Sequence, residues 1–172
     1  MKILVFAASR RKGSFNKKVA AQAAEALGTL PGVLVDHADF AEFEIPVYDG
    51  DLEDASELLP AGVQALISRI RAADAVVVST PEYNGGISGA FKNAIDWVSR
   101  DDAPPTAGKP WLLLGASPGA LGAVRGLWHT RVPLEAMGVF LYPEMMGISQ
   151  AGKAFDDAGK FLAGRVMSEA DS

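Results

Sequence analysis

Short apolar runs alternate along this chain with longer segments in which apolar residues recur every three or four positions. Five of the runs have the length of β-strands: Ile3–Ala8, Val33–Ala38, Ala75–Ser79, Trp111–Ala116 and Val139–Tyr142. Several are apolar nearly throughout, which is typical of strands that helices cover on both faces. Strands that alternate with helices form parallel sheets through right-handed crossovers. The pattern therefore predicts an α/β fold with a doubly wound, five-stranded parallel sheet of order 2-1-3-4-5.

Helical periodicity fills the segments between these strands. The first helix shows it most clearly, because one face carries an apolar residue at every fourth position: Phe15, Val19, Ala23 and Leu27. The third helix has Ser88 near its start, a residue type that favours the N-cap position. In all, we expect helices over Phe15–Leu27, Leu59–Ile70, Ile87–Val98, Leu121–Met137 and Phe155–Met167. The segment Phe43–Asp54, in which proline, glycine and carboxylates cluster, is predicted to be an exposed loop.

Ligands of doubly wound sheets bind beyond the carboxyl ends of the strands, near the point where the strand order reverses. In the predicted order this point lies between the first and third strands. The loops that follow Ala8, Thr80 and Ala116 are therefore the candidates for a functional site.

The first of these loops, Ser9–Asn16, leads from a strand directly into a helix. Backbone N–H groups at the start of a helix have no partner inside it, and the helix dipole adds partial positive charge there. Ser9, Ser14 and Asn16 provide side-chain donors, and Arg11 provides a guanidinium fork. The loop lacks the glycine spacing of the Walker and dinucleotide motifs. A mononucleotide phosphate therefore fits it better than a triphosphate or an NAD pyrophosphate.

The second loop, Ser79–Gly89, also connects a strand to a helix. Gly85 and Gly86 allow a flat ring to approach the backbone closely, and Asn84 offers an amide to the edge of a heterocycle. The third loop, Ala116–Gly122, is small enough to close over the other side of such a ring.

Each loop also has a plainer interpretation. Ser14 can simply cap the helix while the basic residues beside it form a solvated turn. Asn84-Gly85 is a common turn sequence, and Tyr83 can be a packed aromatic residue. The loop chemistry alone leaves these alternatives open.

Composition narrows the classes of function. The length of 172 residues and the 49% share of hydrophobic residues predict a single domain over residues 1–172. A net charge of −5 offers no basic surface for nucleic acid. With no cysteine in the chain, disulfides, thiolate metal sites and cysteine nucleophiles are excluded, so redox chemistry would need a cofactor.

No metal site, membrane segment or export signal is predicted. His37 and His129 lack a second ligand at metal-binding spacing, and the carboxylates of residues 49–54 are expected to form a solvated loop. The apolar start of the chain is too short for a signal peptide, and no apolar run approaches the ~20 residues that cross a bilayer. A cytoplasmic location is the expectation that follows.

Two of the loops carry motifs that resemble the NADPH-dependent FMN reductase family, which includes bacterial flavin-dependent quinone, chromate and azo-dye reductases. The matching segments are Ser9–Asn16, Pro81–Gly85, Lys92–Trp97 and Gly108–Pro110, and the resemblance extends from Met1 to about Gly147. It implies a flavodoxin-like fold that binds FMN and uses NADPH or NADH as co-substrate. Gly86 and Ser88 depart from the family, in which many members have serine and proline at these positions.

Carried over by position, the resemblance also implies the site residues. The phosphate of FMN would be held by Ser9, Arg11, Ser14, Phe15 and Asn16. The ribityl chain and ring would be lined by Pro81, Glu82, Tyr83, Asn84, Gly85, Ser117 and Gly119. Family members form homodimers or dimers of dimers, so we expect Arg100, Arg125 or Glu144 to shape the opening for substrates.

The function implied is an NAD(P)H-dependent oxidoreductase in which the flavin carries the chemistry and no side chain acts as a catalytic group. A hydride passes from the nicotinamide to FMN, and the electrons then pass to a small-molecule acceptor such as a quinone, chromate or an azo compound, in ping-pong order. One alternative is a flavodoxin-type electron carrier without NAD(P)H-oxidising activity. Another is a hydrolase or transferase of a phosphorylated metabolite, for which no loop offers a convincing general base.

Overall fold

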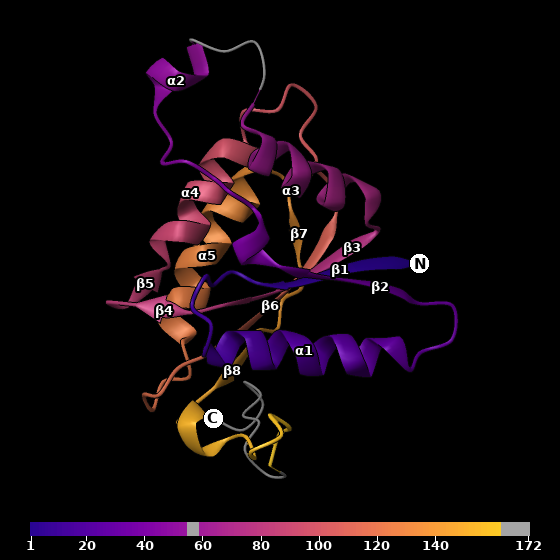
Figure 1. The fold of residues 1–172 in the computed structure, drawn as a ribbon, viewed down its shortest axis with the longest axis vertical. Helices are drawn as coiled ribbons and strands as arrows, with labels where there is room; N and C mark the ends of the chain where they lie inside the picture. The colour runs from indigo at the N-terminus through magenta and orange to yellow at the C-terminus, as the bar shows by residue number, and fades with distance from the viewer. Residues whose placement is uncertain (55–58, 163–172) are drawn as a thin grey trace.

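The structure is a computed structural model that describes residues 1–54 and 59–162. Its main sheet has the strand order β2-β1-β3-β6-β7, and β8 also pairs with β6. The strands are β1 (Lys2–Ala7), β2 (Leu34–Asp39), β3 (Ala75–Thr80), β6 (Pro110–Ala116), β7 (Phe140–Leu141) and β8 (Met146–Ile148), all paired in parallel. This arrangement confirms the flavodoxin-like order 2-1-3-4-5, with β7 and β8 together in the place of the fifth strand (Figure 1).

The fifth strand is where the predicted sheet differs most from the structure. Instead of one strand over Val139–Tyr142, β7 pairs with the start of β6 and β8 pairs with its end. Pro143 lies between the two and has no N–H to donate to a neighbouring strand. The predicted fifth strand and its position in the sheet are correct, and β8 is an additional strand that was not predicted.

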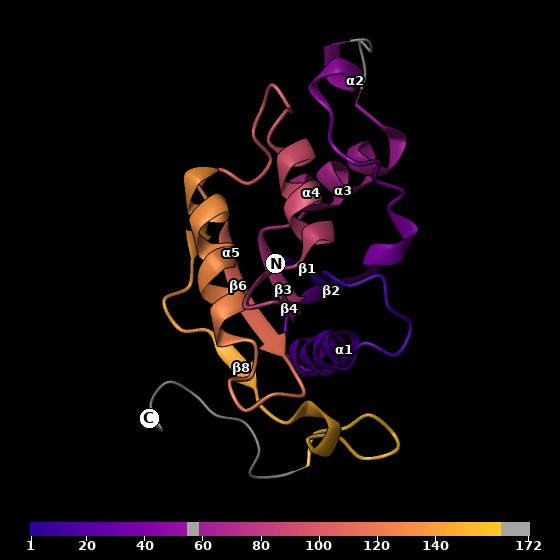
Figure 2. The same ribbon diagram turned by 90° about the vertical axis from the view of Figure 1, so that its left-hand side faces the viewer.

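Helices cover both faces of the sheet (Figures 1 and 2). One face packs against α1 (Phe15–Gly28), and the other packs against α3 (Ala61–Ala72), α4 (Gly89–Val98) and α5 (Val124–Ala136). Side chains of β1 alternate between the two cores, with Leu4 and Phe6 on the three-helix side and Val5 on the α1 side. Burial on both faces explains why the predicted strands are apolar nearly throughout.

The predicted helices are present with shifted ends, apart from the last. The start of α5 lies at Val124 rather than at Leu121, because Gly122 (φ 57°) and Ala123 (φ 71°) adopt left-handed conformations that a right-handed helix excludes. Ser88 is the N-cap of α4, as predicted, and its hydroxyl accepts a hydrogen bond from the N–H of Phe91 at 3.2 Å.

The predicted loop Phe43–Asp54 contains a short helix, α2 (Gly50–Asp54), which the clustered carboxylates concealed. The Asp49 side chain accepts from the N–H of Asp51 at 3.0 Å, which is the capping interaction that favours a helix start. Both views place α2 at the far end of the molecule from α1 (Figures 1 and 2). Within the described ranges, none of the helices combines the length and apolarity needed to cross a membrane.

The predicted last helix, Phe155–Met167, is wrong over residues 155–162, and the rest of it lies outside the described residues. A 3-10 helix over Ala151–Lys153 is followed by a turn, and Phe155 pairs with Phe161 as an isolated antiparallel bridge. Gly159 adopts a φ of 80°, a left-handed conformation that ends helical periodicity. The apolar spacing that suggested a helix instead brings aromatic rings together across this turn.

The Gly108–Pro110 motif stabilises the amino edge of the sheet, where β6 begins. The Nζ atom of Lys109 donates to carbonyl oxygens at the end of α3, namely those of Ile70 at 2.7 Å, Arg71 at 3.0 Å and Ala73. Carbonyls in the last turn of a helix have no partner inside it. Burial lowers the pKa of Lys109, and the nearby Asp74 carboxylate offsets part of this effect. This motif therefore supports the fold and does not contribute to the site.

Candidate functional site

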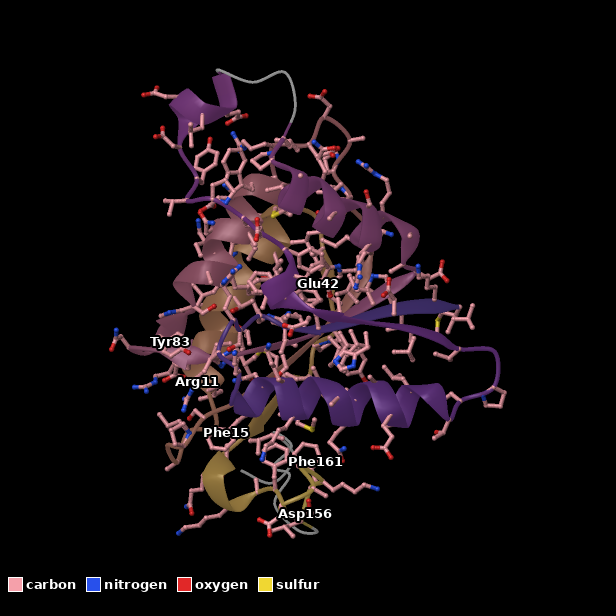
Figure 3. All side chains as sticks on the ribbon, in the orientation of Figure 1. Arg11, Phe15, Glu42, Tyr83, Asp156 and Phe161 are labelled. Carbon is pink, nitrogen blue, oxygen red and sulfur yellow. The ribbon has the colours of Figure 1, made fainter. Side chains whose placement is uncertain are left out.

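The three candidate loops meet at the carboxyl edge of the sheet. The N–H of Ala8 donates to the carbonyl oxygen of Ser79 at 2.9 Å, which joins the first loop to the end of β3. The Ser88 hydroxyl donates to the carbonyl oxygen of Ala8 at 3.4 Å and thereby joins the second loop to the first. Arg11 and Tyr83 lie at the same end of the molecule, beside the start of α1 (Figure 3).

Asn16 connects all three loops from inside the protein. Its side chain is buried. The amide nitrogen donates to the carbonyl oxygen of Ala116 at 3.0 Å, and the amide oxygen accepts from the N–H of Ala116 at 2.9 Å and from the Ser79 hydroxyl at 2.8 Å. Three buried hydrogen bonds to the ends of β3 and β6 fix where α1 begins. Asn16, expected from the sequence to be a phosphate donor, instead makes these three bonds within the protein.

The start of α1 leaves donors free for a ligand. Ser14 occupies the N-cap position, but among the described residues no helical N–H donates to its hydroxyl. The N–H groups of Phe15 and Asn16 belong to the first turn, where an intrahelical partner is impossible. Ser9 is buried nearby, whereas Arg11 is exposed. The plainer interpretation, in which Ser14 acts only as a side-chain cap, is therefore not what the structure shows.

The segment after β2 also borders the first loop, which was not predicted from the sequence. Arg10 donates to the carbonyl oxygen of Phe43 at 3.0 Å, which ties the first loop to the segment after β2. That segment is held on α4 at Pro46, whose carbonyl oxygen accepts from the side chains of Asn93 at 2.8 Å and Trp97 at 2.9 Å. A groove of about 530 Å³ lies here, lined by Arg10, Phe40, Ile45, Val47, Tyr48, Gly89, Ala90, Lys92, Asn93 and Asp96. The matching motif Lys92–Trp97 thus shapes a surface beside the first loop.

The second loop is a β-hairpin, a form that the sequence analysis did not predict. Strand β4 (Glu82–Tyr83) pairs in antiparallel fashion with β5 (Gly86–Ile87). The two connecting residues, Asn84 (φ 51°) and Gly85 (φ 75°), both have positive φ. This is the type I′ turn that Asn-Gly favours, because its twist matches that of the flanking strands. The hairpin exposes Tyr83 and Asn84 at the edge of the site.

Glu82 locks this hairpin onto α5. One carboxylate oxygen accepts from Nε of Arg125 at 2.9 Å and from a terminal nitrogen of the same guanidinium, while the other accepts from the N–H of Gly126 at 3.1 Å. Burial of Glu82 acts to raise its pKa, but the hydrogen bonds from Arg125 and Gly126 outweigh it and leave the pKa below its ordinary value. The packing is tight, because a Cβ at Gly126 would lie 3.0 Å from the Cβ of Glu82.

The third loop is anchored to the chain that follows β8. The N–H of Ser117 donates to Ile148, that of Ala151 donates to Ser117 and that of Gln150 donates to Gly119, with N···O distances of 3.0–3.1 Å. The Ser117 hydroxyl accepts from the N–H of Gly119 at 3.2 Å, which closes the loop on itself. The exposed Gly119 therefore has a fixed backbone at the edge of the site.

The residues expected to shape the opening are not brought together. Arg125 lies against the hairpin, whereas the guanidinium of Arg100 lies 5.9 Å from the ring centre of Tyr48, and Glu144 is exposed on the chain after β7. His129 lies against the hairpin, since a Cβ at Gly86 would lie 3.2 Å from its Nδ1. In residues 1–54 and 59–162, no group of three or more histidines and carboxylates is placed to hold a metal ion.

The arrangement suits an anionic ligand with a flat portion. At the start of α1, N–H groups without a partner in the described part of the chain, hydroxyls and an exposed guanidinium match a phosphate group. The hairpin offers backbone N–H and C=O groups and an aromatic side chain beside it, which suit the edge and face of a heterocycle. Both features lie at the reversal point of the sheet, where this fold class binds ligands.

Comparison with known proteins gives the same class of ligand. A family model described as NADPH-dependent FMN reductase matches residues 1–153. An NAD(P)H-dependent FMN reductase of Pseudomonas aeruginosa is 41% identical over 94% of this chain and 85% of its own length, and a quinone reductase of Escherichia coli K12 is 42% identical over 86% and 77%. A solved flavoenzyme, NAD(P)H:(acceptor) oxidoreductase from Paracoccus denitrificans, superimposes with a TM-score of 0.74 at 29% identity, covering 93% of this chain and 85% of that one. The chain therefore belongs to the NADPH-dependent FMN reductase family of oxidoreductases.

Proposed function

We propose that this chain binds FMN at the carboxyl edge of its sheet and acts as an NAD(P)H-dependent reductase of quinones and similar small acceptors. The proposal rests on the hydrogen-bond donors at the start of α1. Among the described residues, no N–H group in the first turn of α1 donates to the Ser14 hydroxyl. The N–H groups of this turn therefore remain available to a ligand. A phosphate monoester matches these donors and the nearby Arg11 in charge and in acceptor oxygens.

In this proposal the site residues divide into two groups with different tasks. The phosphate is held by Ser9, Arg11, Ser14 and the backbone N–H of Phe15, while Asn16 holds their positions from inside the protein. The ribityl chain and ring are lined by Pro81, Glu82, Tyr83, Asn84, Gly85, Ser117 and Gly119. The ion pair between Glu82 and Arg125 supports this assignment, because it fixes the hairpin against which a ring would rest.

FMN held by these residues would supply the redox chemistry, a hydride acceptor for NAD(P)H and an electron donor for the small acceptor, which we propose bind in ping-pong order. The protein contributes placement and electrostatics, through donors whose directions the fold has already set. We assign no side chain a nucleophilic or proton-transferring role. Relatives named as quinone reductases support quinones as acceptors, and the largely apolar groove beside α4 offers planar molecules a surface next to the first loop.

A titration followed by reduction tests this function. Purified chain is titrated with FMN while flavin fluorescence is recorded, and the complex is then mixed anaerobically with NADPH or NADH. We expect the flavin absorbance to bleach and then to return on addition of a soluble benzoquinone. A chain that takes up no FMN would contradict the proposal, whereas bound flavin that neither nicotinamide reduces would identify a flavodoxin-type carrier.

We also propose that the chain forms a homodimer or a dimer of dimers. Several large apolar side chains are exposed on α5, on β7 and directly after β7: Trp128, Val132, Phe140 and Tyr142. Contiguous apolar patches on a protein surface commonly mark interfaces. Sedimentation velocity over a range of concentrations measures the state directly, and a monomer at every concentration would contradict the proposal.

A further inference from the structure

The segment that follows β8 connects two loops of the site. We call residues 149–162 the C-terminal strap. At its start the N–H groups of Gln150 and Ala151 donate to Gly119 and Ser117 of the third loop, each at 3.0 Å. Farther along, Ala154 and Phe155 are buried in the same core as Val19 of α1. The strap therefore runs from the third loop to the first helix (Figures 1 and 2).

A stack of three aromatic rings joins the strap to the first residue of α1. The rings of Phe15 and Phe155 are parallel within 4°, with centroids 6.3 Å apart, and the rings of Phe155 and Phe161 have centroids 4.8 Å apart at 27°. Figure 3 shows Phe15 at the start of α1 and Phe161 on the strap, on the same side of the helix. A Cβ at Gly152 would lie 3.8 Å from the Phe15 ring, so the strap backbone also contacts this residue.

A tight turn holds the outer ring in place. The N–H of Asp156 donates to the carbonyl oxygen of Lys160 at 2.9 Å, and the N–H of Lys160 donates to the Asp156 carboxylate at 2.8 Å. Beyond the turn, the N–H of Leu162 donates to Ala154 at 2.9 Å. These bonds set Phe161 against Phe155, and Lys18 from α1 lies 5.4 Å from the centre of the Phe155 ring.

The position of Phe15 gives this stack a consequence for the anion site. Phe15 is the first residue of α1, and its backbone N–H has no partner within the helix, nor any hydrogen-bond acceptor among residues 1–54 and 59–162. The strap packs on the α1 side of the sheet, where Ala154 and Phe155 are buried. The Phe15 ring packs on Phe155, which in turn packs on Phe161. The Phe15 ring and the N–H at the helix start belong to the same residue.

We propose that Phe155 and Phe161 are positioning residues for the phosphate group of FMN, acting through Phe15; this inference rests on the proposed function. The stack fixes the orientation of the first turn of α1, so the N–H groups aimed at the phosphate lose little freedom on binding. Immobilising donors before binding raises affinity by lowering the ordering cost. This gain in affinity applies only to a ligand that bears a phosphate group.

The test compares two flavins that differ only in the phosphate. Dissociation constants of FMN and riboflavin are measured by fluorescence for the wild-type chain, Phe161→Ala and Phe161→Tyr. Phe161 is only half-buried, so its replacement is milder than that of Phe155. Leu162→Ala is the matched control, because Leu162 is the next residue, is exposed and lies outside the stack. Thermal unfolding without flavin checks that each variant is folded.

We expect Phe161→Ala to raise the dissociation constant of FMN about three- to tenfold, the range that corresponds to one lost aromatic pair. Riboflavin affinity should stay within about twofold of wild type, and Phe161→Tyr should restore FMN affinity because it keeps the ring. Equal losses for both flavins, or no loss for FMN, would overturn the inference. Failure of the wild-type chain to bind FMN would instead overturn the proposed function.

Discussion

The loop after β1 and the loop after β3 lie side by side at the carboxyl edge of the sheet, yet they use their polar groups in opposite ways. In the hairpin after β3, both oxygens of Glu82 accept hydrogen bonds from α5. In the loop after β1, Ser14 leaves its hydroxyl unused by the helix that it precedes, among the described residues, and Arg11 is exposed. The Glu82 carboxylate of the hairpin is therefore hydrogen-bonded before any ligand binds, whereas Ser14 and Arg11 of the first loop remain available to a ligand.

This difference assigns different tasks to the two loops. Because the Glu82 carboxylate is already bonded to α5, the hairpin is held in place, and its backbone groups are positioned for the edge of a flat ring. Unpaired donors at a helix start suit an anion, which supplies the missing acceptors. The first loop is nevertheless not loose, because Asn16 anchors it from below and Phe15 packs against the C-terminal strap. Variants that separate anchoring from ligand binding can therefore test the comparison.

Asn16→Ala is expected to have the largest effect, and on stability rather than on affinity alone. It removes three buried hydrogen bonds and leaves the Ser79 hydroxyl and both polar backbone groups of Ala116 without that partner. Each buried group left unsatisfied costs about 1–3 kcal/mol. We expect unfolding without flavin to be easier by at least about 3 kcal/mol, which lowers Tm by roughly 6–12 °C.

Calorimetry or circular dichroism on the flavin-free protein measures this change. Gln22→Ala is the control on the same helix, because among the described residues the Gln22 side chain hydrogen-bonds only to Glu25, at 3.2 Å, in an exposed position. If Asn16→Ala kept the wild-type Tm and lost only FMN, Asn16 would be a ligand-binding residue and not an anchor.

Arg11→Ala should show the opposite behaviour. The side chain is exposed, so its removal should leave Tm nearly unchanged. A hydrogen bond between charged groups contributes about 1.5–3 kcal/mol, so the FMN dissociation constant should rise roughly 10- to 100-fold. Riboflavin should bind as it does to the wild type. Fluorescence titration measures both constants, and Arg100→Ala, which removes the same charge beside Tyr48, is the control.

If Arg11→Ala bound FMN as tightly as the wild type, Arg11 would not be one of the residues that bind the phosphate. It would also weaken the contrast between the loops, because the first loop would then hold an anion through backbone and hydroxyl groups alone.

The parts of the fold that the sequence predicted are those with local causes. Continuous apolar runs marked the inner strands, and Ser88 marked the start of α4, because burial on both faces and an N-cap each need particular residue types nearby. The loops of the site were located by the same means, as the segments between strand and helix. Their positions at one edge followed from the strand order.

What the sequence left hidden depends on contacts between distant residues. The partners of Asn16 lie 63 and 100 positions away, and those of Glu82 lie 43 and 44 positions away. The last helix was predicted from apolar spacing that actually serves the stack of Phe155 and Phe161 across a glycine turn. Apolar residues six or seven positions apart, such as Phe155, Phe161 and Leu162, cannot by themselves distinguish a helix from such a turn.

Glu82→Gln should have the smallest effect, and its dependence on pH is the informative part. The pKa of Glu82 is lowered in the folded protein, so the carboxylate stabilises the fold at neutral pH and loses this contribution as pH falls through the folded pKa. Arg125 is 58% exposed, so solvent screening limits the loss at pH 7 to about 1 kcal/mol, or roughly 2–4 °C in Tm. The difference from wild type should shrink as pH falls below the ordinary glutamate pKa of about 4.3, and it should vanish once pH lies below the lowered pKa of the folded state, where the wild-type carboxyl is also neutral. Glu135→Gln on α5 breaks an exposed pair with Arg131 and should change stability by only a few tenths of a kcal/mol. A difference between Glu82→Gln and wild type that persists in acid would mean that the ion pair does not lock the hairpin, and that packing against Gly126 alone makes the second loop rigid.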